Sequence, residues 1–190
     1  MNPFSLEHGK AAYFADFVAY AVIVAALTAL LAVSSPKGEG FSLIALAAAG
    51  LAGWTLAEYL LHRFVLHGLA PFRNWHTLHH RRPTALISTP TLLSAGLIVA
   101  LVAAPAAFLG GRWDACALTV GVSGGYLAYA ITHHATHHGR ARGRWLRRRK
   151  HWHARHHHLG TPAGCYGVTG EFWDRVFGTV VHTTRPARPA

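Results

Sequence analysis

The sequence is poor in charged residues, in acidic residues above all, and in cysteine. Charged side chains make up 13% of its 190 residues, against roughly 25% in an ordinary soluble domain. Seven acidic residues face 18 lysines and arginines, so the net charge is +11. The two cysteines, Cys116 and Cys165, lie far apart without metal-type spacing. These shortages argue against a soluble globular domain, a disulfide framework and a carboxylate-rich metal site.

Long hydrophobic segments are abundant instead. Four of them approach or exceed the length of about 20 helical residues that crosses a bilayer: Ala11–Val33, Phe41–Leu61, Leu86–Leu109 and Ala115–Ile131. The first is too long for the core of a signal peptide, contains Asp16 and follows no cationic stretch. We therefore predict an all-α integral membrane protein with four transmembrane helices. We expect one domain over residues 1–182 and a disordered tail over residues 183–190.

The positive charges lie on one side of the predicted membrane. The loop after the first segment contains only Lys37 and the loop after the third only Arg112, whereas the second loop holds four arginines. Eleven more lysines and arginines follow the fourth segment. By the positive-inside rule we expect both termini and the second loop in the cytoplasm, and the Ala- and Arg-rich composition suggests a bacterial inner membrane. Nucleic-acid binding is disfavoured because the most basic run, Arg140–Lys150, follows a membrane segment.

Histidine is abundant, with sixteen residues, and most of them lie in the two basic regions. They form the motifs HRFVLH (62–67), HTLHH (76–80), HHATHH (133–138) and HARHH (153–157). Residues i, i+3 and i+4 share a helix face. We therefore expect the three histidines of HTLHH to converge on one metal region, and likewise those of HARHH. His62 and His67 are five residues apart, so we expect the helix to end between them, with a cap near Gly68.

The number of patterned histidines indicates two metal ions. Imidazole binds iron, zinc, copper and nickel, and a structural zinc takes four ligands. Eleven candidates are too many for one ion and suit a binuclear, nitrogen-ligated centre on the cytoplasmic side. A loose metal-buffering tract would have irregular spacing, and binding of lipid headgroups is a further alternative. The predicted ligands are His62, His67, His76, His79, His80, His133, His137, His138, His153, His156 and His157.

Two carboxylates lie close to these motifs in the sequence. Glu58 precedes His62 by one helical turn, so it either accepts a hydrogen bond from a metal-bound imidazole or pairs with Arg63 or another arginine. Both interpretations stay open. For Asp174, in FWDRVFG, we expect a structural ion pair with an arginine.

The motifs resemble those of the fatty acid hydroxylase superfamily, a membrane group that includes sterol desaturases and carotenoid ring hydroxylases. EYLLHRFVLH (58–67), HTLHH, GYLAYAITHHATHHG (125–139) and HWHARHHH (151–158) are similar to its four histidine boxes, in order. YGVTGEFWDRVFGT (166–179) is similar to its closing segment. The resemblance covers nearly two thirds of the chain, and the EYxxHRFxxH and WDxVFGT patterns look most similar to fatty acid 2-hydroxylases.

The resemblance implies an O2-dependent membrane lipid hydroxylase with a histidine-ligated di-iron centre in a cytoplasmic, His-rich helical cap. The eleven histidines would hold two iron ions, with zinc as another possible occupant in isolated protein. The substrate would be a fatty acid or fatty-acyl lipid. Electrons would come from a separate electron-transfer protein, because the chain has no room for the haem domain fused to some relatives. Alternatives are a carotenoid or sterol hydroxylase or desaturase, and a non-catalytic membrane metal-binding protein.

Overall fold

The protein is all-helical over the residues that the structure, a computed structural model, describes: 7–158 and 164–181. Four helical spans in these ranges are long and apolar enough to cross a membrane: Lys10–Ser34, Gly40–Leu66, Thr91–Gly110 and Arg112–His138. The predicted fold class and the four predicted transmembrane segments are therefore confirmed. The tail predicted to be disordered, residues 183–190, lies outside the described residues.

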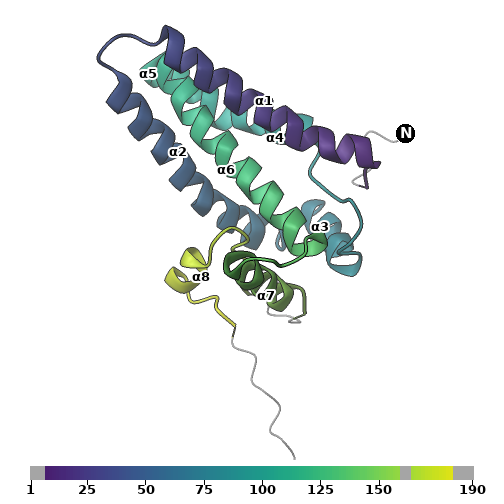
Figure 1. Ribbon diagram of the computed structural model, residues 1–190. Helices are drawn as coiled ribbons and strands as arrows, with labels where there is room; N and C mark the ends of the chain where they lie inside the picture. The colour runs from purple at the N-terminus through teal and green to yellow at the C-terminus, as the bar shows by residue number, and fades with distance from the viewer. Residues whose placement is uncertain (1–6, 159–163, 182–190) are drawn as a thin grey trace, which may run out of the picture.

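The four spans lie alongside one another, and three short helices gather at one end of them (Figure 1). The spans consist of α1 (Lys10–Ser34), α2 (Gly40–Leu60) with the π-helical η1 (Leu61–Leu66), α4 (Thr91–Ile98) with the π-helical η2 (Val99–Ala103) and α5 (Ala104–Gly110), and α6 (Arg112–His138). The short helices are α3 (Phe72–Arg81), α7 (Arg144–His158) and α8 (Phe172–Val176).

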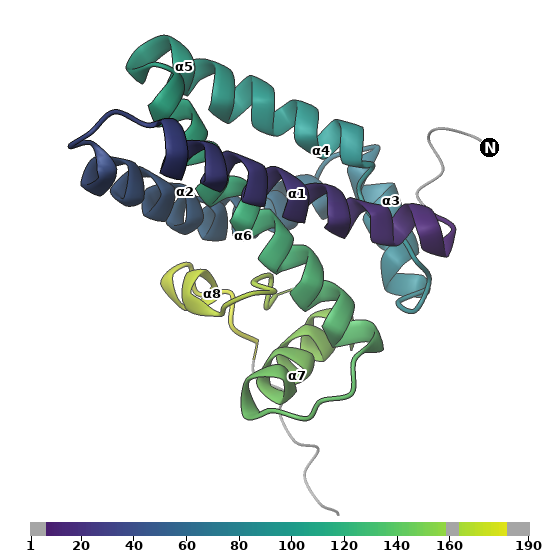
Figure 2. The same ribbon diagram turned by 45° about the horizontal axis from the view of Figure 1, so that its top comes forward.

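Helix α6 is the central span. It packs against α1, α2 and α5 (Figure 2), and it is the most buried of the four. The other spans direct large apolar side chains outward, and Val33, Phe41, Leu92 and Phe108 are each at least 85% exposed. An apolar surface of this extent suits the hydrocarbon interior of a bilayer.

Glycines set the close approach of α2 and α6. A Cβ atom at Gly121 would overlap the carbonyl oxygen of Ala47, and one at Gly125 would overlap the ring of Trp54. Small residues at a helix crossing let two backbones approach closely in a membrane. Ala47 faces Gly121 and Trp54 faces Gly125, so α2 and α6 run in parallel. The C-terminal end of α2, which continues into η1 with His62, therefore lies at the same end of the molecule as the C-terminal end of α6 with its histidines.

Candidate metal centre

Ten of the eleven predicted histidines gather into two groups. Within each group the ring nitrogens lie within 4.8 Å of one another. Group A consists of His62, His67, His76, His80 and His156. Group B consists of His79, His133, His137, His153 and His157. The groups are adjacent, because the rings of His80 and His157 stack with centroids 4.2 Å apart.

Each group draws four histidines from one helix–loop–helix unit and a fifth from the other. The unit of η1 and α3 gives group A two pairs, His62 with His67 and His76 with His80, and it gives His79 to group B. The unit of α6 and α7 mirrors this division. It gives group B two i, i+4 pairs, His133 with His137 and His153 with His157, and it gives His156 to group A.

The prediction that the histidines of HTLHH converge on one metal region is wrong, and so is the same prediction for HARHH. A residue at i+4 lies about 40° past residue i around the helix, whereas one at i+3 falls about 60° short of it. The pair i and i+4 therefore turns toward one group and i+3 toward the other. His79 and His156 are the two i+3 residues, and each belongs to the group opposite its box.

His62 and His67 meet because the helix widens, so the prediction that it ends between them is also wrong. The backbone N–H of His67 donates to the carbonyl oxygen of His62 at 3.2 Å, an i to i+5 bond. Their ring centroids lie 5.3 Å apart, and both rings join group A. Such π-helical turns occur frequently at functional sites.

His138 has no place in either group. On α6, His137 follows His133 by one helical turn, and His138 lies a further 100° or so around the helix. Its ring stacks instead on that of His134, with centroids 4.6 Å apart. His134 in turn contacts the hydroxyl of Tyr13 on α1, at 3.3 Å.

Burial keeps the grouped imidazoles of α3 and α7, those of His76, His79, His80, His153, His156 and His157, neutral at pH 7. Burial, with a smaller contribution from neighbouring histidines, lowers the pKa of His79 to about 3, that of His80 to about 4 and that of His157 to about 2. The pKa values of His76 and His153 lie well below the ordinary value for the same reasons. Neutral imidazole is the form that binds a metal.

The ring nitrogens in each group point at one another. The Nε2 atoms of His62 and His76 lie 2.9 Å apart, and those of His137 and His153 lie 2.8 Å apart. Several nitrogen lone pairs directed at one point repel each other unless a cation lies between them. Five imidazoles make a donor set that suits iron, zinc, copper or nickel. Each group therefore fits a metal ion.

Two backbone carbonyls orient the rings of group A. The Nδ1–H of His62 donates to the carbonyl oxygen of Tyr166 at 2.6 Å, and that of His156 to the carbonyl oxygen of Gly164 at 2.9 Å. A ring that donates from Nδ1 keeps the lone pair on Nε2, the atom that faces the group. The sequence held no signal for these carbonyls, because every residue has one.

Within the described residues, Glu58 has neither of the roles considered from the sequence. Its carboxylate is buried, and it accepts hydrogen bonds from the backbone N–H groups of Val168 and Thr169 and from the Thr169 hydroxyl, at 2.6–2.9 Å. Arg63 donates to the Tyr59 hydroxyl instead, at 2.8 Å. Glu58 therefore reaches His62 through the segment 164–169.

The expected pairing of Asp174 with an arginine is wrong for the described part of the chain. Asp174 is fully buried and accepts from the backbone N–H groups of Tyr166 and Gly167, both at 2.8 Å. The Thr179 hydroxyl and the Trp152 indole N–H also donate to it, at 2.7 and 3.3 Å. Four donors satisfy this carboxylate without a counter-ion.

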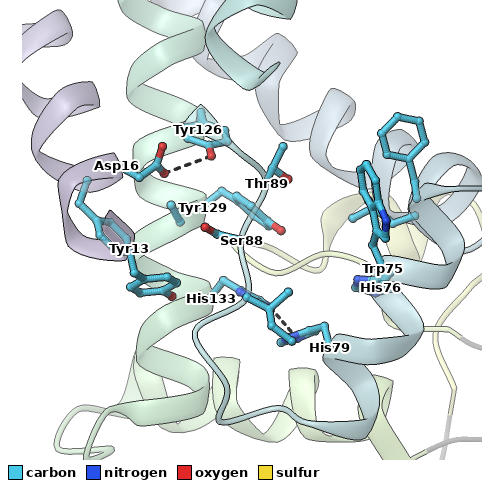
Figure 3. Close-up of a pocket in the computed structure, with 15 residues that line it drawn as sticks. Tyr13, Asp16, Trp75, His76, His79, Ser88, Thr89, Tyr126, Tyr129 and His133 are labelled. Atoms are coloured by element: carbon cyan, nitrogen blue, oxygen red, sulfur yellow. Dashed lines mark hydrogen bonds between the residues drawn. The ribbon is translucent and has the colours of Figure 1, made fainter. Parts of the chain in front are cut away.

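A cavity of about 90 Å³ lies beside both histidine groups (Figure 3). His76 of group A and His79 and His133 of group B line it. Asp16 forms part of the wall and accepts hydrogen bonds from the hydroxyls of Thr91, at 2.7 Å, and Tyr126, at 3.2 Å. Further lining residues include Phe17, Phe72, Trp75, Ser88, Thr89 and Ala130. Asp16 was a sequence clue to this cavity, as an acidic residue inside a membrane span.

Four membrane-spanning helices with two five-histidine groups at one end define a multi-pass membrane protein with a candidate binuclear metal centre. A model of the fatty acid hydroxylase family matches residues 47–179. The chain belongs to the fatty acid hydroxylase family, as its histidine boxes predicted.

Individual relatives agree with this assignment. The chain is 34% identical over 168 residues to the dihydroceramide fatty acyl 2-hydroxylase FAH2 of Arabidopsis thaliana, covering 80% of this chain and 67% of the relative. It is 36% identical over 143 residues to the ceramide very long chain fatty acid hydroxylase scs7 of Schizosaccharomyces pombe, covering 68% of this chain and 40% of the relative. A solved structure of full-length scs7p, in which only the hydroxylase domain is visible, matches with a TM-score of 0.77 and 26% identity. That match covers 94% of this chain and 70% of the other.

Proposed function

We propose that the protein is an O2-dependent membrane lipid hydroxylase whose two histidine groups bind two iron ions. The observation that carries this proposal is the position of the cavity. Histidines of both groups line it, His76 from group A and His79 and His133 from group B. A carbon atom held in the cavity therefore lies beside both proposed metals.

The proposed reaction needs a redox metal because acid–base side chains do not oxidise an unactivated C–H bond. Two bound iron ions would supply that chemistry. One oxygen atom of O2 enters the C–H bond to give an alcohol, and the other leaves as water. The balance requires two electrons and two protons, and we assign the electrons to a separate electron-transfer protein. The chain contributes the ligands, their orientation and the position of the substrate.

The walls of the cavity suit the polar end of a fatty-acyl lipid. Phe72 and Trp75 offer apolar contact, while Asp16, Ser88 and Thr89 offer polar groups within the same small space. We therefore expect the carbon atom that is hydroxylated to lie close to the polar head of the lipid. The relatives named above are fatty acyl hydroxylases, which favours a fatty-acyl substrate over a carotenoid or a sterol.

The distribution of lysine and arginine supports a cytoplasmic centre with both termini on the same side. The short helices α3 and α7, which carry six of the ten grouped histidines, gather at one end of the spans (Figure 1), and we assign that end to the cytoplasm. We assign the protein to a bacterial inner membrane on its composition, although the relatives named above are eukaryotic.

The proposed activity is tested with iron-loaded protein in lipid nanodiscs. Fatty-acyl lipids, isotopically labelled O2 and a chemically reduced electron carrier are added, and the lipids are analysed by mass spectrometry. The expected product carries one labelled oxygen on the acyl chain. His79→Ala should abolish it, while His138→Ala, outside both groups, should retain it. A new double bond would indicate a desaturase. Unchanged lipids, with both metals bound, would favour a metal-binding protein without catalysis.

A further inference from the structure

The two histidine groups differ in how their rings are held. In group A, the Nδ1 atoms of His62 and His156 donate to carbonyl oxygens of Tyr166 and Gly164. Those carbonyls belong to a short non-helical segment, residues 164–168, which is buried along its whole length. The position of this segment therefore sets the direction in which both rings point.

Two buried carboxylates hold that segment. One belongs to a residue that precedes the segment in the sequence, and the other to a residue that follows it. Glu58 on α2 precedes it by more than a hundred residues and binds the backbone N–H groups of Val168 and Thr169. Asp174 on α8 follows it and binds the backbone N–H groups of Tyr166 and Gly167. Hydrogen bonds from N–H groups to a carboxylate are stronger than neutral ones. Four consecutive N–H groups are thus fixed by two side chains.

Group B shows no comparable support within the described residues. The Nδ1 atoms of His79 and His157 are buried and make no hydrogen bond there. A metal-bound imidazole ordinarily donates its second N–H to a carbonyl or a carboxylate, and losing that partner weakens metal binding 10- to 100-fold as an order of magnitude. These two rings of group B therefore lack the anchoring that His62 and His156 have in group A.

We infer that Glu58 and Asp174 are positioning residues that clamp group A, so that the two metals of the proposed centre are held unequally. The inference rests on the proposed binuclear centre. It assigns the tightly held metal to group A and the more readily released metal to group B. In this account Glu58 orients group A indirectly. Its carboxylate accepts hydrogen bonds from the 164–169 segment and does not contact a grouped histidine.

The two carboxylates respond differently to replacement by an amide. One oxygen of Glu58 accepts both backbone N–H groups, and the other contacts only the Thr169 hydroxyl. A glutamine keeps these contacts, because its NH2 group can donate to that hydroxyl. Asp174 accepts a backbone N–H on each of its two oxygens. An asparagine there must turn its NH2 group toward one of them. Glu58→Gln should therefore preserve the clamp, and Asp174→Asn should break it.

The test measures metal per chain and the rate of metal release to a chelator in full-length, detergent-purified protein. Wild type should hold close to two metals and release them in two phases. Glu58→Leu and Asp174→Asn should each lose close to one metal, while Glu58→Gln should match wild type. Glu39→Leu makes the same change at the exposed start of α2 and should also match wild type.

A second substitution identifies the group that is affected. His153→Ala removes a ligand of group B, and adding Glu58→Leu should then leave no bound metal. His156→Ala removes a ligand of group A, and adding Glu58→Leu should leave the remaining metal in place. If Glu58→Leu does not elute as a folded species, Thr169→Ala is the milder variant. It loses only the hydroxyl contact and should speed the slower phase of release alone.

Four results would overturn the inference while leaving the binuclear centre intact. Glu58→Leu could keep both metals with wild-type release, or Thr169→Ala could release them at the wild-type rate. Glu58→Gln could lose metal as fully as Glu58→Leu, which would point to charge rather than hydrogen-bond acceptance. Glu58→Leu could strip metal equally in both histidine backgrounds, which would indicate a general structural defect. Fewer than two metals in folded wild type would overturn the proposed centre and the inference with it.

Discussion

His79 and His80 are neighbours in the sequence, yet their rings belong to different groups, with centroids 6.0 Å apart. His156 and His157 are divided in the same way, with centroids 5.7 Å apart. The two H-x-x-H-H boxes therefore lie between the groups and contribute to both. Adjacent histidines therefore provide matched pairs of variants. Substituting one histidine of a pair removes a ligand from one group, and substituting its neighbour affects a different site.

Metal content should separate His137 from His138. His137 lies in group B, whereas His138 stacks on His134 away from both groups. We expect His137→Ala to lower the metal content by about one ion per chain and His138→Ala to leave it at the wild-type level. Elemental analysis of the two purified variants measures this directly. Equal losses would mean that His138 is a ligand.

Filling the cavity should block the substrate without disturbing the metals. Ala130 lines the cavity from α6, whereas Ala128 on the same helix is exposed. We expect Ala130→Phe to lower kcat/KM at least tenfold, because a phenyl group occupies space that the lipid needs. Ala128→Phe should behave as wild type, and both variants should keep full metal content. Unchanged turnover in Ala130→Phe would place the substrate elsewhere.

The crossing of α2 and α6 should tolerate no side chain at Gly121. A Cβ atom there overlaps the backbone of Ala47, while a Cβ atom at Gly124 meets nothing within 4 Å. We expect Gly121→Ala to destabilise the protein by about 1–3 kcal/mol, the usual range for overpacking. Gly124→Ala should be neutral or slightly stabilising, because alanine favours helix. Thermal unfolding in detergent compares them, and a similar Tm for both would contradict the close crossing.

Asp16 should contribute to stability through its two hydroxyl partners. It joins α1 to Thr91 at the start of α4 and to Tyr126 on α6. Replacing it by leucine leaves both hydroxyls without this acceptor, at a cost of about 1–3 kcal/mol for the buried Tyr126 hydroxyl and less for the half-buried Thr91 hydroxyl. Asp16→Asn should lose less, since its amide still has one acceptor oxygen. Metal content should stay at the wild-type level in both variants, because Asp16 lies outside both histidine groups; a loss of metal would connect Asp16 to the centre.

The membrane spans could be predicted from the sequence, and so could most of the histidines that gather in the two groups, because both follow local rules. Apolar length predicts a span, and i, i+4 spacing places His133 beside His137 and His153 beside His157. The division of the boxes was not predictable in the same way. Whether His79 joins its own box or the opposite one depends on where α6 and α7 lie, and that is a tertiary property.

The π-helical turn at His62 and the contacts of Glu58 and Asp174 with the 164–169 segment could not be predicted from the sequence, for related reasons. An i to i+5 bond at His62 leaves no compositional trace, so an ordinary helix end was the natural expectation. Glu58 acts on backbone N–H groups more than a hundred residues away. Backbone groups look alike in any sequence, and only the fold reveals which ones a buried carboxylate meets.

The most direct test of the binuclear centre is the metal content of detergent-purified protein, measured for wild type, His79→Ala, His156→Ala and the double variant. The two positions lie in different groups, so the substitutions remove ligands from separate sites. We predict close to two metals per wild-type chain, close to one in each single variant and close to none in the double variant. One metal or none in freshly purified, folded wild type would contradict the centre.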